Sequence, residues 1–257
     1  MMTQDERLIF LLRDLLAERK EYEDIPVPDS LSEKRRLLRS LMNVRPPVPV
    51  REDFLRVQDA YLVDRLAERG VTRLKDLTPV RPGLYLWQGD ITTLAVDAIV
   101  NAANSQMLGC FVPCHGCIDN AIHTYAGVQL RLECARLMTG QEEEPTGNAK
   151  ITKAYNLPCR YILHTVGPII SEAVTQADRE LLASCYRTCL ELAEASGLHS
   201  VAFCCISTGE FHFPNELAAE IAIQTVGEWQ RQTPDKIKVI FNVFKNRDYE
   251  IYKRLLR

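Results

Sequence analysis

The stretch from Asn101 to Gly127, NAANSQMLGCFVPCHGCIDNAIHTYAG, holds the residues that decide the fold and the chemistry of this chain. Its middle contains four possible metal ligands within eight positions: Cys110, Cys114, His115 and Cys117. A helix or strand would turn some of these side chains to opposite faces, whereas a loop with glycine and proline can point three of them at one place. Thiolate and imidazole donors favour zinc, and three protein ligands leave a fourth position open for water or substrate. A structural zinc finger needs two separated pairs, so the alternative here is a group of buried or redox-active thiols.

The composition is that of an ordinary globular protein without a nucleic-acid or membrane partner. The 257 residues are 46% hydrophobic and 25% charged, and this length suits one domain of about 180 residues with an appendage. A net charge of −3 offers no basic surface to nucleic acid. The N-terminal residues MMTQDERLIFLLRDLL place acids before apolar residues, the wrong order for an export signal, and no apolar run approaches the length of a membrane span. We therefore expect a cytoplasmic protein whose nine cysteines are reduced thiols.

Residues 1–80 are predicted to form a helical N-terminal extension that packs onto the main domain, and residues 3–80 contain no strand pattern. One stripe at helical spacing carries apolar side chains: Leu8, Leu12, Leu15 and Leu16. Three helices are expected, over residues 7–20, Ser30–Asn43 and Glu52–Arg69. Ser30 and Glu33 form a capping box at the start of the second helix, and Gly70 is the expected C-cap of the third. A leucine stripe usually marks a core face, and a partner-binding surface is the alternative.

From Leu84 onward, short apolar strands alternate with helices. The expected strands are LYLWQ (84–88), DAIVNAA (97–103), KITKAY (150–155), YILHTV (161–166), SVAFCC (200–205) and KVIFNVF (238–244). The expected helices are Ile118–Thr139, Gln176–Ser196 and Asn215–Gln232. This alternation predicts an α/β domain over residues 81–257, with a largely parallel sheet and helices on both faces. Ligands of such folds bind at the carboxyl ends of the strands.

Polar and aromatic side chains at these strand ends suit a nucleotide-like ligand. Asp90, after the first strand, can accept hydrogen bonds from an amine such as that of adenine, or can simply cap a helix. Asn101 and Asn104, separated by two alanines, can contact sugar hydroxyls, although asparagine also favours turns. Phe244, at the end of the last strand, can stack on a base or belong to the core.

A glycine-bearing loop after the fifth strand, from Ser207 to Pro214, runs directly into the expected helix at Asn215. The backbone N–H groups of such a loop and the positive end of a helix dipole suit a diphosphate. No Lys or Arg occurs between Val201 and Gln230, so dipoles rather than cations would neutralise the phosphates. The alternative is that this loop only connects the strand to the helix and binds no ligand.

The order of five motifs, GDIT (89–92), NAAN (101–104), IHTYAG (122–127), HTVGP (164–168) and STGEFHFP (207–214), resembles the macrodomain family. The resemblance extends from Leu84 to the C-terminus, about two-thirds of the chain. It implies a three-layer α/β/α fold with a mixed, mainly parallel sheet. The Cys–His–Cys loop and the helical N-terminal extension are also similar to one subclass, the zinc-dependent macrodomains.

The same resemblance implies ADP-ribose as the ligand and Zn²⁺ as the cofactor. Asp90 and the backbone of Ile91 would contact adenine, and Asn104, with Asn101 close behind it, would contact the distal ribose. The implied diphosphate loop consists of Ser207, Thr208, Gly209, Glu210 and Phe211, and the implied zinc ligands are Cys110, His115 and Cys117, with Cys114 left over. Asp119 aligns with the catalytic Asp of metal-free hydrolytic macrodomains, but their glycine run and Val-Asp-Gly are replaced here by CFVPCHGC and Ile118-Asp119-Asn120.

The implied activity is removal of mono-ADP-ribose from modified proteins by cleavage at the distal ribose, with Asp119 and Asn104 as catalytic residues. Zinc could deliver the water, or it could hold a ribose hydroxyl while Asp119 activates the water. The alternatives are a non-catalytic ADP-ribose reader with a zinc-shaped pocket and a hydrolase of a small ADP-ribosyl metabolite. The resemblance also suggests a modified carrier protein as substrate and a sirtuin-type ADP-ribosyltransferase as partner.

Overall fold

A mixed seven-stranded sheet forms the centre of the protein, whose computed structural model describes residues 2–234 and 236–257. Its strands are β2 (Pro79–Arg81), β3 (Leu84–Gln88), β5 (Ala98–Ala103), β6 (Ala149–Lys153), β7 (Tyr161–Val166), β8 (Ser200–Phe203) and β9 (Lys238–Val243). They lie in the order β2-β3-β9-β8-β5-β7-β6, with antiparallel pairing only at the β2 and β6 edges. The four central strands, β9, β8, β5 and β7, are almost continuously buried, as expected for parallel strands covered on both faces.

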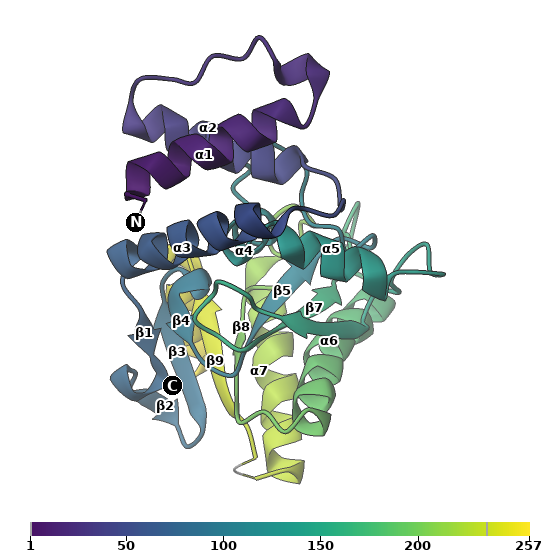
Figure 1. Cartoon of the computed structure of the whole chain (residues 1–257). Coiled ribbons are helices and arrows are strands. Elements are labelled where there is room, and N and C mark those ends of the chain that lie inside the picture. The colour runs from purple at the N-terminus through teal and green to yellow at the C-terminus, as the bar shows by residue number, and fades with distance from the viewer. Residues whose placement is uncertain (1, 235) are drawn as a thin grey trace.

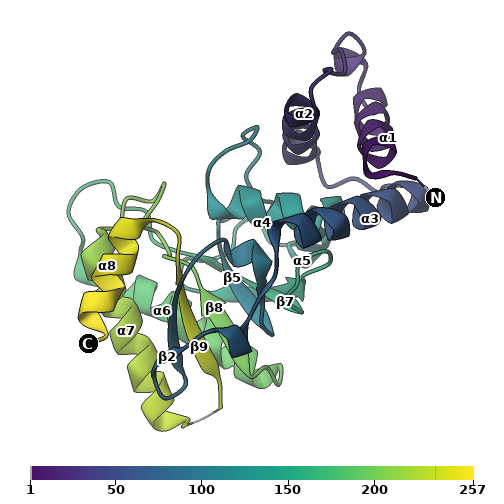
Figure 2. The same cartoon turned by 90° about the vertical axis from the view of Figure 1, so that its left-hand side faces the viewer.

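Helices cover both faces of this sheet (Figure 2). One face carries α4 (Ile118–Ala126) and α5 (Val128–Leu137), and the other carries α6 (Gln176–Ala195), α7 (Asn215–Gln232) and α8 (Asn246–Leu255). The apolar side chains between these layers form the largest core cluster, in which Tyr186, Phe203, Phe213 and Phe241 are the bulkiest fully buried members. The predicted three-layer α/β/α fold with a mainly parallel sheet is therefore confirmed.

Three further helices, α1 (Gln4–Ala17), α2 (Leu31–Val44) and α3 (Glu52–Arg69), stand beside α4 and α5 (Figure 1). Their apolar faces meet in a second cluster built around Phe54 and the leucines of α1, and Val128 at the start of α5 joins it. No helix among the described residues combines the length and the apolar character that crossing a membrane requires.

Most expected elements are found close to their expected bounds, and Glu52–Arg69, with Gly70 as its C-cap, matches residue for residue. Ser30 caps α2 through the backbone N–H of Glu33, but the Glu33 carboxylate accepts from the Ser30 hydroxyl and not from the Ser30 backbone N–H, so only half of the expected capping box is formed. The expected single helix over 118–139 is wrong, because the chain forms two helices there, α4 and α5, separated by a turn at Gly127. Gly127 has φ of 102°, and a Cβ at this position would lie 2.6 Å from the side-chain amide of Gln58.

The expectation that residues 3–80 contain no strand is also wrong. A two-residue strand, β1 (Thr72–Arg73), pairs with β4 (Leu94–Ala95), and β2 joins the edge of the main sheet. Both segments are too short to show a period-two pattern. The remaining elements are 3₁₀ turns: η1 (Lys20–Tyr22), η2 (Leu74–Asp76) and η3 (Ile91–Thr93). The C-terminal helix α8 was not expected.

Candidate active site

A cavity of about 730 Å³ lies at the carboxyl ends of β3, β5, β8 and β9. Most of the residues expected to form a site line this cavity: Asp90, Ile91, Asn104, Cys110, His115, Cys117, Asp119, Ser207, Thr208, Gly209, Glu210, Phe211 and Phe244. Phe244 is 74% exposed, which excludes the alternative of a core position and leaves its ring free at the rim. The strand-end loops therefore converge on one pocket, as the fold requires.

Asp119, in the first turn of α4, lies buried at the wall of this pocket. One carboxylate oxygen accepts a hydrogen bond from the Asn101 amide at 2.8 Å, and the other lies 3.5 Å from the Asn104 amide. Burial raises the pKa of Asp119 to about 6, and the hydrogen bond from Asn101 and the charge of Arg131 oppose this rise. Two amides thus fix the orientation of a carboxylate that faces the pocket.

Asn101 does not line the pocket, in contrast to the expected contact with ribose. It lies inside β5, fully buried, and its amide donates both to Asp119 and toward Nδ1 of His164 at 3.2 Å. Because the amide donates to Nδ1 of His164, the other ring nitrogen carries the proton that it donates to the Thr152 hydroxyl at 2.8 Å. Asn101 therefore orients the Asp119 carboxylate by a hydrogen bond without lining the pocket itself.

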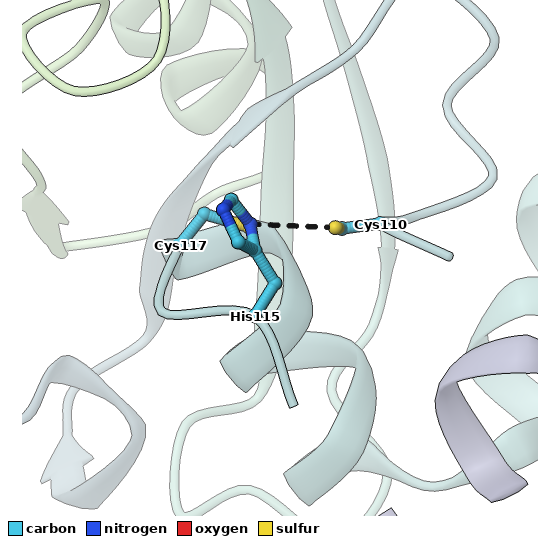
Figure 3. A group of neighbouring side chains, drawn as sticks. All are labelled: Cys110, His115 and Cys117. Carbon is cyan, nitrogen blue, oxygen red and sulfur yellow. Dashed lines mark hydrogen bonds between the residues drawn. The ribbon is translucent and has the colours of Figure 1, made fainter. Parts of the chain in front are cut away.

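The structure brings Cys110, His115 and Cys117 together, with one ligand atom of each lying within 4.8 Å of the others (Figure 3). The Cys110 sulfur is 3.6 Å from Nδ1 of His115. Two ligands at the usual Zn–S and Zn–N bond lengths in a tetrahedral site are ~3.5 Å apart, so this spacing fits zinc. Burial raises the pKa of the Cys117 thiol to about 12, so the thiolate needs a cation to hold it at neutral pH.

The second ring nitrogen of His115 faces the loop expected to bind diphosphate. Nε2 of His115 lies 3.6 Å from a carboxylate oxygen of Glu210. A histidine that ligates a metal through one nitrogen commonly directs the other N–H at a carboxylate, which fixes its tautomer and orientation. The position of Glu210 therefore agrees with Nδ1 as the ligand atom, and it connects the two loops across the pocket.

A second group of possible ligands, His123, Cys134 and His164, also brings its donor atoms within 4.8 Å of one another. All three side chains are buried behind the pocket, and by spacing alone this group could also hold a metal. Nε2 of His164 is already occupied by Thr152, however, and burial lowers the pKa of both histidines far below the ordinary value. This group has no signature in the sequence, because its members come from α4, α5 and β7 and share no local motif.

The loop from Ser207 to Phe213 is held in one shape by its own backbone. Ser207 has φ of 63°, and its carbonyl accepts the N–H of Phe213 at 2.9 Å. Across from it, Gly167 comes so close that a Cβ there would lie 2.0 Å from the Ser207 hydroxyl oxygen. The Ser207 hydroxyl is buried and has no hydrogen-bond partner within the described part of the chain.

At the opposite end of the pocket, Asp90 has the helix-capping role considered for it, and both of its carboxylate oxygens contact protein groups. One carboxylate oxygen caps η3 by accepting the N–H of Thr92 at 2.9 Å. The other lies 3.0 Å from the guanidinium of Arg69, whose face packs 3.6 Å from the ring of Tyr125. Sequence reasoning missed Arg69 and several residues of the lining, among them Arg39, Tyr125 and Lys245. Two of these carried a signal, because Tyr125 stands in the IHTYAG motif and Lys245 directly follows Phe244 at a strand end.

The fold is that of a macrodomain, as shown by the strand order, the pocket at the strand ends and the glycine-bearing loop. The chain belongs to the macrodomain family, and the Macro domain model matches residues 100–222. A Treponema medium protein named protein-ADP-ribose hydrolase is 55% identical, over 99% of this chain and 100% of that protein. A Staphylococcus aureus (strain MRSA252) protein of the same name is 50% identical, over 96% and 94%. Among solved structures, the crystal structure of a Trypanosoma brucei macrodomain in complex with ADP-ribose matches with a TM-score of 0.67. The sequence of that macrodomain is 30% identical, and the match covers 90% of this chain and 97% of the macrodomain chain.

Proposed function

We propose that this protein is a zinc-dependent hydrolase that removes mono-ADP-ribose from modified proteins by cleavage at the distal ribose. The two relatives that carry the name protein-ADP-ribose hydrolase align with almost the whole chain, including the N-terminal helices. The structural relative from Trypanosoma brucei binds ADP-ribose. These likenesses support the ligand and the reaction class.

The observation that carries the proposal is that a buried carboxylate and a group of metal-ligating side chains share one pocket wall. Asp119 follows Cys117 by two residues as the chain enters α4, and both line the cavity together with Asn104. A module that only recognises ADP-ribose needs hydrogen bonds and stacking, whereas a buried carboxylate held by two amides costs free energy that simple binding does not require.

Cys110, His115 and Cys117 would hold the zinc, whose chemistry when bound is to act as a Lewis acid toward a water or a ribose hydroxyl. The chain itself supplies the groups around the reacting carbon. Asp119 accepts a proton from the attacking water, and Asn101 and Asn104 keep its carboxylate directed into the pocket. Cleavage at an anomeric carbon passes through an oxocarbenium-like state, so the placement of this carboxylate matters most.

The ligand would extend from the zinc ligands to Asp90. Its diphosphate would contact Ser207 to Phe211 at the start of α7, and its adenine would lie between Asp90, Ile91 and the exposed ring of Phe244. The macrodomain resemblance further suggests a modified carrier protein as the substrate and a sirtuin-type ADP-ribosyltransferase as the enzyme that makes it.

Release of free ADP-ribose from a mono-ADP-ribosylated protein tests the proposal. We expect time-dependent release by the native chain and release slower by ~10²–10⁴-fold by the Asp119→Asn variant. Binding of ADP-ribose without any release would instead identify a reader. Release only from a small ADP-ribosyl metabolite would identify the third candidate.

A further inference from the structure

The segment that carries the proposed metal ligands, residues 110–117, has no helix or strand of its own. We call it the metal loop. An irregular segment of this kind must satisfy its backbone polar groups elsewhere. Several of its hydrogen bonds lead to α2 of the N-terminal extension, more than 70 residues earlier in the chain.

Arg39, on α2, makes the central contact. Its guanidinium donates to the carbonyl oxygen of His115 at 2.9 Å and, through two nitrogens, to the side-chain oxygen of Asn120 at 3.1 and 2.7 Å. Asn120 in turn donates its side-chain amide to the carbonyl of Val112 at 2.9 Å and its backbone N–H to the Cys117 sulfur at 3.4 Å. One cation therefore fixes the backbone of one proposed ligand and, through Asn120, the sulfur of another.

A second contact from α2 explains why Cys114 stands apart from the proposed ligands. Cys114 adopts a φ of 53°, and its N–H donates to the side-chain oxygen of Asn43 at 2.9 Å. Its sulfur lies 3.2 Å from the Ser40 hydroxyl, on the side of the loop that faces α2. The left-handed turn at Cys114 is thereby held by the helix, and it turns the neighbouring His115 toward Cys110.

Arg131, buried on α5, ties the other end of the loop to the same helix. Its guanidinium donates to the carbonyl of Asn43 at 2.7 Å near the C-terminal end of α2 and to the carbonyl of Leu108 at 2.6 Å, just before Cys110. A cation at a helix C-terminus satisfies carbonyls that have no partner within the helix. The entry of the metal loop and its middle are thus both fixed relative to α2.

We propose that α2 is a clamp that preorganises the metal loop, and that Arg39 is the positioning residue through which it acts on His115 and Cys117. The identity of the metal rests on the proposed function, whereas the clamp itself rests on these hydrogen bonds. The N-terminal extension is accordingly part of the machinery of the site. Its loss would loosen the metal ligands without removing any of them.

The test compares Arg39→Met with Arg36→Met in the full-length protein. Both substitutions remove a guanidinium from α2, but the Arg36 side chain is exposed and makes no hydrogen bond or ion pair to the described residues. The rate of zinc transfer to a coloured chelator is measured for each, after thermal unfolding has confirmed that the fold is intact. Loss of a partner that orients metal ligands typically costs ~10–100-fold in metal affinity. We expect a release rate faster by that order for Arg39→Met and an unchanged rate for Arg36→Met.

Arg39→Lys refines the comparison, because lysine keeps the charge but not the forked geometry, so its release rate should lie between those of the native chain and Arg39→Met. Zinc release from Arg39→Met at the native rate would overturn the clamp. If the native chain binds no zinc, the proposed metal fails, and amide hydrogen exchange over residues 110–117 then decides the clamp by itself. Faster exchange in Arg39→Met than in Arg36→Met would support it, and equal exchange would refute it.

Discussion

The guanidinium of Arg69, the last residue of α3, lies 3.0 Å from the carboxylate of Asp90, at the end of the pocket that we propose to bind adenine, and 2.8 Å from the hydroxyl of Thr92. The same guanidinium packs against Tyr125, which lines the pocket from α4. The orientation of a ligand-facing carboxylate therefore depends on a helix of the N-terminal extension.

Replacing Arg69 with Met should weaken ADP-ribose binding on the order of fivefold, because it frees the Asp90 carboxylate and removes the cation from Tyr125. Calorimetric titration with ADP-ribose measures the change. Arg56→Met is the matched control, since this exposed side chain on α3 has no ion pair or side-chain hydrogen bond to the described residues. Equal affinities of the two variants would contradict the assigned role of Arg69.

Asp119→Asn should retain zinc and ADP-ribose affinity but slow release of ADP-ribose by ~10²–10⁴-fold, the usual contribution of a general base. Single-turnover kinetics on a mono-ADP-ribosylated protein, together with a binding titration, separate these effects. If affinity and rate fall together, Asp119 contributes to binding rather than to the transition state. A fully active variant would instead favour water activation by the metal alone.

Cys117→Ser should lose zinc, and turnover with it, whereas Cys114→Ser should keep its metal because Cys114 faces α2. Elemental analysis of both purified variants checks this expectation. Cys134→Ser addresses the buried group formed with His123 and His164. Should the metal content follow Cys134 and not Cys117, the assignment of the metal to the pocket would be wrong.

His164 should make folding stability sensitive to acid. Burial lowers its pKa from 6.5 to about 3, so between these values the unfolded chain binds a proton that the folded chain does not. Stability is therefore lost as the pH falls through 6.5, and the loss is complete below about 3. From pH 7 to pH 4 it should reach about 3 kcal/mol.

Urea unfolding of the native chain and of His164→Gln at several pH values measures this loss. The difference between the two curves isolates His164 from Asp119, whose raised pKa acts in the opposite direction. Parallel curves from pH 7 to pH 4 would show that His164 does not titrate in this way.

The sheet and the pocket could be predicted from the sequence because their signals are local. Strands such as Tyr161–Val166 are short runs rich in aliphatic and aromatic residues, and the polar residues that follow such strands gather at one edge whatever the details of packing. The turn at Gly127 was missed because a glycine inside an apolar helical pattern does not by itself show a close approach by Gln58.

The contacts of the N-terminal helices with the pocket could not be predicted in this way. Arg39 and Asn120 are 81 residues apart, and no spacing in the sequence relates them. Asn101 was expected to face the ligand because it lies near the carboxyl end of its expected strand, residues 97–103. It lies within β5, and the alternation of side chains along the strand directs it to Asp119 and His164.

The close approach of Gly167 to Ser207 has a consequence for the entropy of binding. A Cβ at position 167 would overlap the Ser207 hydroxyl, so the residue after β7 and the loop before α7 pack in direct contact, and this contact restricts the loop on one side. Ordering one flexible residue costs about 1–2 kcal/mol. A loop whose backbone is already confined by its neighbour loses little of this freedom when a ligand arrives. Ligand affinity at this end of the pocket thus depends on the lack of a side chain at Gly167 as well as on the atoms that touch the ligand.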